Sequence, residues 1–164
     1  MKNSRFRLLL VIAITLLALA SVTTVFAAKP DVETFHNEGS FVAADCGSFL
    51  ALEDFVEDAR VTTFFDQAGN PVRVQVHVNF EGILTNTATG LTLRDPGHFT
   101  IVFDLQEGTT TQVGLIFGIT VPGEGIAVLD AGKIVFDEEG NVIFEGGPHQ
   151  FLEGGEALIC AALD

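Results

Sequence analysis

Tryptophan and tyrosine are absent from this 164-residue chain, and basic residues are scarce, with eight Lys and Arg against 22 Asp and Glu. Without Trp or Tyr, the usual aromatic platform for sugar rings is missing, which disfavours carbohydrate recognition. The charge balance disfavours nucleic acids and anionic membrane surfaces as partners, because both attract clustered Lys and Arg.

Motifs of several enzyme classes are missing as well. After residue 27, serine occurs only at Ser40 and Ser48, and neither lies in a Gly-x-Ser-x-Gly turn of the esterase type. No glycine-rich loop is followed by Lys-Ser or Lys-Thr, as a phosphate loop requires. The four histidines are dispersed, with no His-x-His or His-Glu-x-x-His pair to supply two metal ligands. We therefore expect neither a metal ion nor a cofactor.

The first 27 residues have the pattern of a secretory signal peptide. Basic residues between positions 2 and 7 precede an apolar run over 8–20, and residues 25–27 fit the small-x-Ala pattern before a cleavage site. These 27 residues hold three of the eight basic side chains and none of the acids, so the remaining 137 residues would carry a formal charge of −17. We expect cleavage after Ala27 and an extracellular protein with no membrane attachment. An uncleaved anchor is the alternative, although it would need about 20 apolar residues.

Two cysteines lie near the two ends of the expected mature chain. An oxidising compartment favours a disulfide between Cys46 and Cys160. The alternative, a nucleophilic or metal-binding thiolate, is disfavoured because no Cys-x-x-Cys spacing is present.

The chain after residue 27 has the size of a single domain, and its hydrophobic pattern is that of strands. Apolar residues alternate with polar ones from Val72 to Glu81, which predicts a strand with one buried and one wet face. Residues 112–121 repeat the alternation. Further predicted strands are Phe49–Glu53, Ala59–Phe65, Leu91–Arg94, His98–Leu105, Ile126–Phe136 and Val142–Glu145, and a short helical or coil segment covers Glu153–Leu163.

Tight turns connect these strands. Residues 65–70 and 136–141 share the pattern Phe-Asp-x-x-Gly-Asn, in which Asp accepts backbone N–H bonds and Gly supplies a positive φ. A calcium loop is the alternative for these acids, but neither stretch has the ligand spacing of an EF-hand.

About eight short antiparallel strands, joined by tight turns and tied at their ends by a disulfide, predict an all-β fold. We expect a single up-and-down barrel over residues 28–164, because neighbouring strands connect as hairpins and a sandwich would need longer crossovers.

Four further stretches of the sequence form a pattern of turns around the cysteine pair. They are Ala44–Phe49, Asn79–Thr92, Asp137–Asn141 and Cys160–Leu163. Together they resemble a group of uncharacterised secreted proteins of actinobacteria and related bacteria, which carries no established activity. At the level of the fold, the chain is also similar to the calycin and allene oxide cyclase barrels, which implies an enclosed apolar cavity.

Two polar residues are candidate catalytic groups. His77 shares a strand face with Arg73, Gln75 and Asn79, and this face is either solvated or lines a polar pocket where Glu81 or Asp104 could join it. Asp130 occupies an apolar row, so it should pair with an arginine or with backbone N–H groups, or have a raised pKa. Alternatively, a bulge at Ala131-Gly132 turns it outward.

The 15 phenylalanines, 13 of them after residue 27, either fill a packed core or line a cavity for a small hydrophobic ligand. Candidate ligand-binding residues are Phe65, Phe80, Phe103 and Phe117. Three functions remain open: a secreted binder of a small hydrophobic ligand, an extracellular structural or interaction module, and a barrel enzyme of the cyclase or isomerase type. Neither the ligand nor the oligomeric state follows from the sequence.

Overall fold

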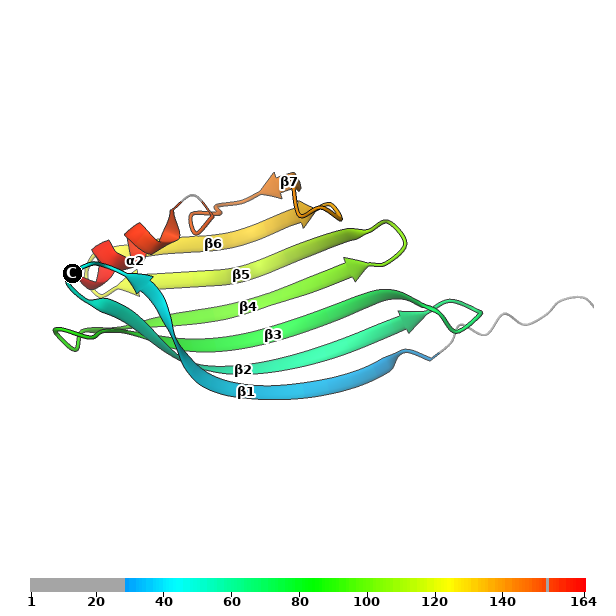
Figure 1. The fold of residues 1–164 in the computed structure, drawn as a ribbon, viewed down its shortest axis with the longest axis horizontal. Coiled ribbons are helices and arrows are strands. Elements are labelled where there is room, and N and C mark those ends of the chain that lie inside the picture. Colours follow the sequence, from blue (N-terminus) through cyan, green and yellow to red (C-terminus); the bar gives the residue numbers. More distant parts are fainter. Residues whose placement is uncertain (1–28, 153) are drawn as a thin grey trace, which may run out of the picture.

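The computed structural model describes residues 29–152 and 154–164, so the predicted signal peptide lies outside the described residues. The described chain forms one antiparallel sheet of seven strands, in which each strand pairs with its neighbours in sequence (Figure 1). The elements are β1 (Asp31–Asp45), β2 (Leu50–Phe65), β3 (Pro71–Asn86), β4 (Thr92–Asp104), β5 (Thr109–Val121), β6 (Gly125–Phe136), β7 (Val142–Gly146) and α2 (Gly155–Leu163). Within the described ranges, no helix is long and apolar enough to cross a bilayer.

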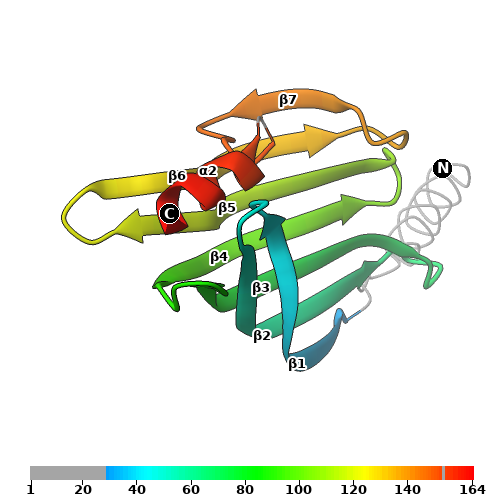
Figure 2. The ribbon, with the colours of Figure 1, turned by 60° about the vertical axis from the view of Figure 1, so that its left-hand side comes forward.

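The sheet is open, so a closed barrel of about eight strands is not confirmed. Strands β1 and β7 form its two edges, and in the described chain they do not pair with each other. Helix α2 contacts β1, β2 and β6 at one end of the curved sheet (Figure 2). The predicted all-β class, the up-and-down order and the C-terminal helical segment are confirmed.

Several strands are longer than predicted. The predicted segments Phe49–Glu53 and Ala59–Phe65 belong to the single strand β2, and Leu91–Arg94 and His98–Leu105 both belong to β4. Strand β1 has no counterpart among the predicted strands, because it lies at an edge and every residue from Asp31 to Val42 is exposed. Both its faces are wet, so its sequence lacks a clear apolar alternation.

The two Phe-Asp-x-x-Gly-Asn turns adopt the predicted form. Asp66 accepts hydrogen bonds from the backbone N–H groups of Ala68 and Asn70, each at 2.8 Å, and Asp137 accepts one from Asn141 at 2.7 Å. The hydrogen bonds from the following asparagine lower the pKa of both aspartates below the usual range.

The two faces of the sheet differ in chemistry. Directly opposed residues share a face, so Val61, Val76 and Ile101 lie together on the face that α2 covers in part, which we call the inner face. Arg60 and His77 lie opposite each other on the other, outer face. The polar face that the sequence predicts opposite the valines is therefore the solvated outer face.

The hydrophobic core occupies only one end of the inner face. Ile159 and Leu163 of α2 pack there against Ala51, Leu84 and Val128, and all five are buried. Cys46, which follows β1, is bonded to Cys160 of α2 with the two Cα atoms 5.5 Å apart, as the sequence predicts. The disulfide thus ties the helix to the first edge of the sheet.

Candidate functional site: an apolar hollow beside a buried carboxyl pair

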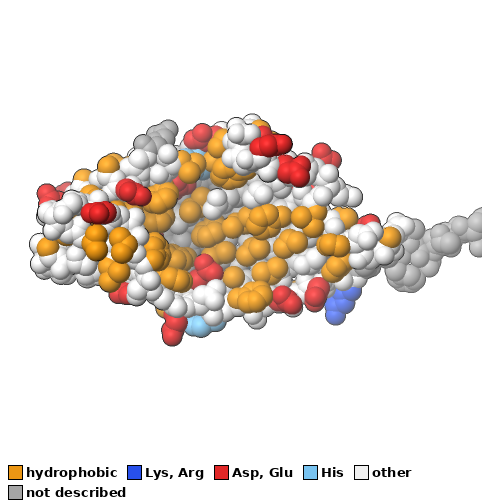
Figure 3. All heavy atoms as spheres, in the orientation of Figure 1, with side chains coloured by type: hydrophobic (Ala, Val, Ile, Leu, Met, Phe, Trp, Pro, Cys, Tyr) orange, Lys and Arg blue, Asp and Glu red, His pale blue; other side chains and the backbone are white. Residues whose placement is uncertain are grey.

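The other end of the inner face is apolar but uncovered by the helix. Hydrophobic side chains gather there across the hollowed surface of the sheet (Figure 3). We define the apolar hollow as six residues of β2, β3 and β4 that are half-buried or exposed and share the inner face: Val61, Val74, Val76, Phe99, Ile101 and Phe103. The inner-face row from Val74 to Phe80 extends about 20 Å along its strand, at roughly 3.3 Å per residue. Contiguous apolar surface of this kind is typical of a binding site.

Two carboxylic acids are fully buried on the inner face, between the apolar hollow and the core. They are Glu53 on β2 and Asp95 on β4. The backbone N–H of Gly118 donates a hydrogen bond to Asp95 Oδ1 at 2.9 Å. Both oxygens of Glu53 and Oδ2 of Asp95 have no donor among the described residues. The absence of a side chain at Gly82 leaves space for the Glu53 carboxyl group, because a Cβ at position 82 would overlap it.

Burial makes both acids hard to ionise. Desolvation, with the charge of Asp95, raises the pKa of Glu53 to about 8. Desolvation also raises the pKa of Asp95 to about 6, although the hydrogen bond from Gly118 acts in the opposite direction. The two carboxyl groups are close enough for each to influence the pKa of the other. One proton held between them at neutral pH would supply the donor that their oxygens otherwise lack.

From the raised pKa values of this pair we expect Glu53→Gln to change the stability of the protein in a pH-dependent way. Because their pKa values are raised in the folded state, protonation of these acids stabilises the fold. This contribution is complete below about pH 4, the ordinary pKa range of these acids, and is lost as pH rises through 6 to 8. The amide of the variant stays neutral, so the variant should gain stability relative to the wild type between pH 5 and pH 9, by about 2 kcal/mol or more at about 1.4 kcal/mol per pKa unit.

Urea denaturation of the wild type and the variant at pH 5 and at pH 9 measures the difference in their free energies of unfolding. Glu38→Gln, which removes an exposed carboxylate of the outer face, is the matched control and should show no such gain. A stability difference for Glu53→Gln that stays constant with pH would contradict the buried titration.

Three phenylalanine rings, one pair edge-to-face and the other stacked, lie between the carboxyl pair and the apolar hollow. The ring centroids of Phe41 and Phe55 lie 5.8 Å apart, and those of Phe55 and Phe80 lie 5.6 Å apart. Phe80 also borders the space above Gly82 and Gly97. These rings exclude water from the pair, which accounts for the raised pKa values.

Asp130 is buried and does not turn outward, so the predicted bulge alternative is wrong for this residue. Its partner is also not an arginine. Nδ1 of His149, which is equally buried, lies 3.0 Å from Asp130 Oδ1. Burial opposes the imidazolium, but the hydrogen bond and charge of Asp130 outweigh it, and the pKa of His149 is raised. The pair anchors the segment after β7 to β6, where Asp130 and His149 form an isolated bridge.

His77 lies on the outer face and is exposed. Its ring nitrogens lie 2.8 Å from Thr100 Oγ1 and 3.0 Å from Gln75 Nε2, and a shallow surface pocket of about 400 Å³ adjoins it. The structure does not bring His77 and Asp130 together, because they occupy opposite faces of the sheet. The alternative in which His77 lines an interior polar pocket therefore loses its basis.

Of the four candidate ligand-binding phenylalanines, Phe80 and Phe103 lie on the open part of the inner face. Phe117 also lies on the inner face, but Phe151 covers it in a stacked arrangement with centroids 4.9 Å apart. Phe65 is half-buried at the end of β2. Phe80 and Phe103 are thus the two that a ligand in the hollow would meet.

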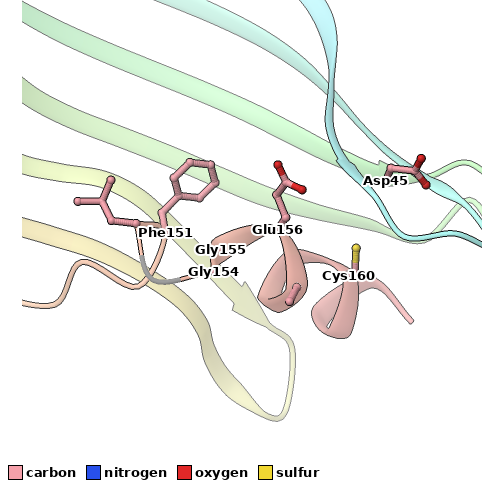
Figure 4. Close-up of a pocket in the computed structure, with 8 residues that line it drawn as sticks. Asp45, Phe151, Gly154, Gly155, Glu156 and Cys160 are labelled. Carbon is pink, nitrogen blue, oxygen red and sulfur yellow. The ribbon is translucent and has the colours of Figure 1, made fainter. Parts of the chain in front are cut away.

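A surface pocket of about 510 Å³ lies where β1 and α2 approach each other. Asp45 at the end of β1 and Glu156 and Cys160 of α2 line it, with Phe151 at its opposite side (Figure 4). The described part of the chain contains no cluster of three or more His, Cys, Asp or Glu that could hold a metal ion. We regard this pocket as the gap that the open sheet leaves beside the disulfide.

Comparison with known proteins gives no match, whether to protein-family models, to curated sequences or to solved structures. The resemblance to secreted actinobacterial proteins and to calycin barrels stays a prediction. The function must therefore be argued from the site itself.

Proposed function

We propose that this protein is an extracellular binder of a small hydrophobic ligand, which it holds in the apolar hollow. The observation that carries the proposal is the uncovered half of the inner face, where valine, isoleucine and phenylalanine side chains remain partly accessible. The helix fills only the other half. Secretion is supported by the signal-peptide pattern of residues 1–27 and by the disulfide.

Binding would be driven by the removal of apolar surface from water. Each Å² of apolar surface that a ligand covers contributes about 25 cal/mol before the cost of association. On the outer face, apolar side chains are interrupted by charged and polar ones, since His77, Asn79 and Arg60 are exposed there. A ligand should therefore bind to one face of the sheet only.

Two adjacent residues of β4 give a matched test of this proposal. Ile101 lies on the inner face and Val102 on the outer face, and both are half-buried. Ile101→Asn should weaken binding of the neutral fluorescent probe N-phenyl-1-naphthylamine about tenfold, since the loss of roughly 1.4 kcal/mol of apolar contact corresponds to that factor. Val102→Asn should leave probe binding unchanged.

Probe titration should be combined with sedimentation, which reports the oligomeric state of each sample. Absence of probe binding would overturn the proposal, and so would a dimer in which the hollow is covered by a second copy. Equal losses in the two variants would show that the probe reports general loosening of the sheet and would overturn the assignment to the hollow.

A further inference from the structure

The basic residues of the strands are confined to one face of the sheet. All four basic residues of the strands, Arg60, Arg73, Arg94 and Lys133, lie on the outer face. Their opposed residues show this: Arg60 faces His77, Arg73 faces Asp104, Arg94 faces Ile83, and Lys133 faces Val113. No Lys or Arg of the described strands lies on the inner face, so this face has no permanent positive charge.

Carboxylates, in contrast, occur on both faces, and on the inner face they lie beside and within its apolar part. Glu57 on β2 is half-buried and lies between Asn37 on β1 and Phe80 on β3. Glu33 faces Val61 at one flank, and Glu145 faces Ile134 at the other. The inner face therefore combines apolar surface with charge of one sign.

Glu57 lacks a cationic partner. Its Oε1 accepts a hydrogen bond from Asn37 Nδ2 at 3.3 Å, which is a neutral donor, and none of the ion pairs of the described chain includes Glu57. Four residues earlier on the same strand and face, Glu53 is fully buried with both oxygens unpartnered. A half-buried carboxylate on an apolar surface gains most from a cation that the ligand itself brings.

We propose that the ligand of the apolar hollow is a cationic amphiphile, an apolar chain or ring bearing an ammonium group that pairs with Glu57. This inference rests on the proposed function and adds the charge of the ligand to it. A fatty acid or another anionic amphiphile would be repelled by Glu33, Glu57 and Glu145. A neutral ligand would cover Glu57 without replacing the water it loses, which is unfavourable.

A second copy of the chain is a poorer occupant of this surface. Two copies would bring the same carboxylates face to face, and each chain without residues 1–27 would carry a formal charge of −17. Like charges across an interface disfavour such a contact. A small cation bound on this face would instead offset part of the negative charge of its carboxylates.

Three probes with the same alkyl chain test the inference: decyltrimethylammonium, decanol and decanoate, each below its micelle concentration. Their ability to displace N-phenyl-1-naphthylamine from the full mature chain is measured at low salt. Decyltrimethylammonium should displace the dye at a concentration at least about tenfold lower than decanol, and decanoate should be the weakest. The preference should shrink at high ionic strength, because salt screens a partly exposed pair.

Glu57→Gln should reduce this preference about tenfold, because its neutral amide no longer pairs with the ammonium group and costs decanol less to cover. Glu57→Asp, which keeps the charge, should retain most of the preference, and Glu38→Gln on the outer face should retain all of it. Circular dichroism verifies that each variant is folded.

The outcomes separate the two proposals. Failure of the dye to bind overturns the proposed function itself. Dye binding with equal displacement by all three probes overturns only the cationic ligand. An equal loss of preference in Glu38→Gln and Glu57→Gln would mean that the total charge of the protein attracts the probe, and this also overturns the assignment to Glu57.

Discussion

Replacing Cys46 and Cys160 by alanine together is expected to lower the free energy of unfolding by about 4 to 5 kcal/mol. The bond joins residues 114 positions apart, so it closes a loop that contains almost the whole described chain. In the chain-entropy model, the stabilisation by a disulfide grows with the logarithm of loop length and reaches this magnitude for a loop of about 100 residues. Such a loss is a large part of the stability of an ordinary domain.

The location of the bond adds a local effect. Helix α2 has nine residues, too few to be stable alone in water, and its first turn lacks a side-chain cap. The disulfide holds it against β1, and without the bond Ile159 and Leu163 would leave the core more readily. We expect early loss of protection from hydrogen exchange in α2 of the double variant.

Urea denaturation with and without reductant measures the effect. The wild type should become less stable on reduction and approach the double variant, whereas the variant should not respond to reductant. Equal midpoints for the oxidised and the reduced wild type would contradict this prediction.

The second large effect is expected for Gly132→Ala, at about 3 kcal/mol or more, because it combines backbone strain with steric overlap. Gly132 has φ of +132°, a region that L side chains rarely adopt. A Cβ there would overlap the carbonyl oxygen of Gly146 and approach Gly147 Cα within 2.9 Å. These neighbours are backbone atoms and cannot rotate away, so the chain after β7 would have to separate from β6.

Gly140→Ala is the matched control. Gly140 also has a positive φ, +84°, but nothing lies within 4 Å of a Cβ placed on it. The free energy of unfolding of this variant should fall only by the cost of backbone strain, about 1 kcal/mol. Thermal or chemical denaturation compares the two, and similar losses would show that close packing at Gly132 is not the cause.

The structure explains why Gly132 is so tightly surrounded. Gly114 faces it on β5, also with a positive φ of +127°, and a Cβ at Gly114 would overlap the His98 carbonyl oxygen. Glycines at such positions let strands bend and approach closely. We infer that this row of glycines contributes to the curvature that makes the inner face hollow.

Much of the sheet could be predicted from alternation alone. The valines of β3 and the apolar residues of β6 alternate clearly, because each of these strands has one face toward the apolar side. The row from Val113 to Val121 of β5 does not keep to one face, because the register shifts between Leu115 and Phe117. Val113 faces Lys133 on the outer face, whereas Phe117 faces Asp130 on the inner face. The two turns with the Phe-Asp-x-x-Gly-Asn pattern were predictable from their local hydrogen bonds. The cysteine pairing followed from there being only two cysteines.

The predictions failed where the inner face carries acids or glycine. The stretch 54–58, which contains Glu57, divided β2 into two predicted segments, and 95–97, which contains Asp95 and Gly97, divided β4. A signal was present: Glu53 lies between Ala51 and Phe55 in an alternating row, and Asp95 lies between Leu93 and Gly97. The acid predicted in an apolar row is Asp130, whose partner His149 is 19 residues away.

The sequence by itself determined the strand-rich fold, the neighbour-to-neighbour hairpin order and the cysteine pair, because alternation, turn chemistry and cysteine number are properties of short segments or of composition. Only the tertiary structure decided that the sheet stays open, that α2 covers half of the inner face, and that Glu53 meets Asp95 across β3. These features depend on sheet curvature and on contacts between residues far apart in sequence. Local periodicity does not encode such distances, since the same strands could close into a barrel or remain open with their apolar face exposed.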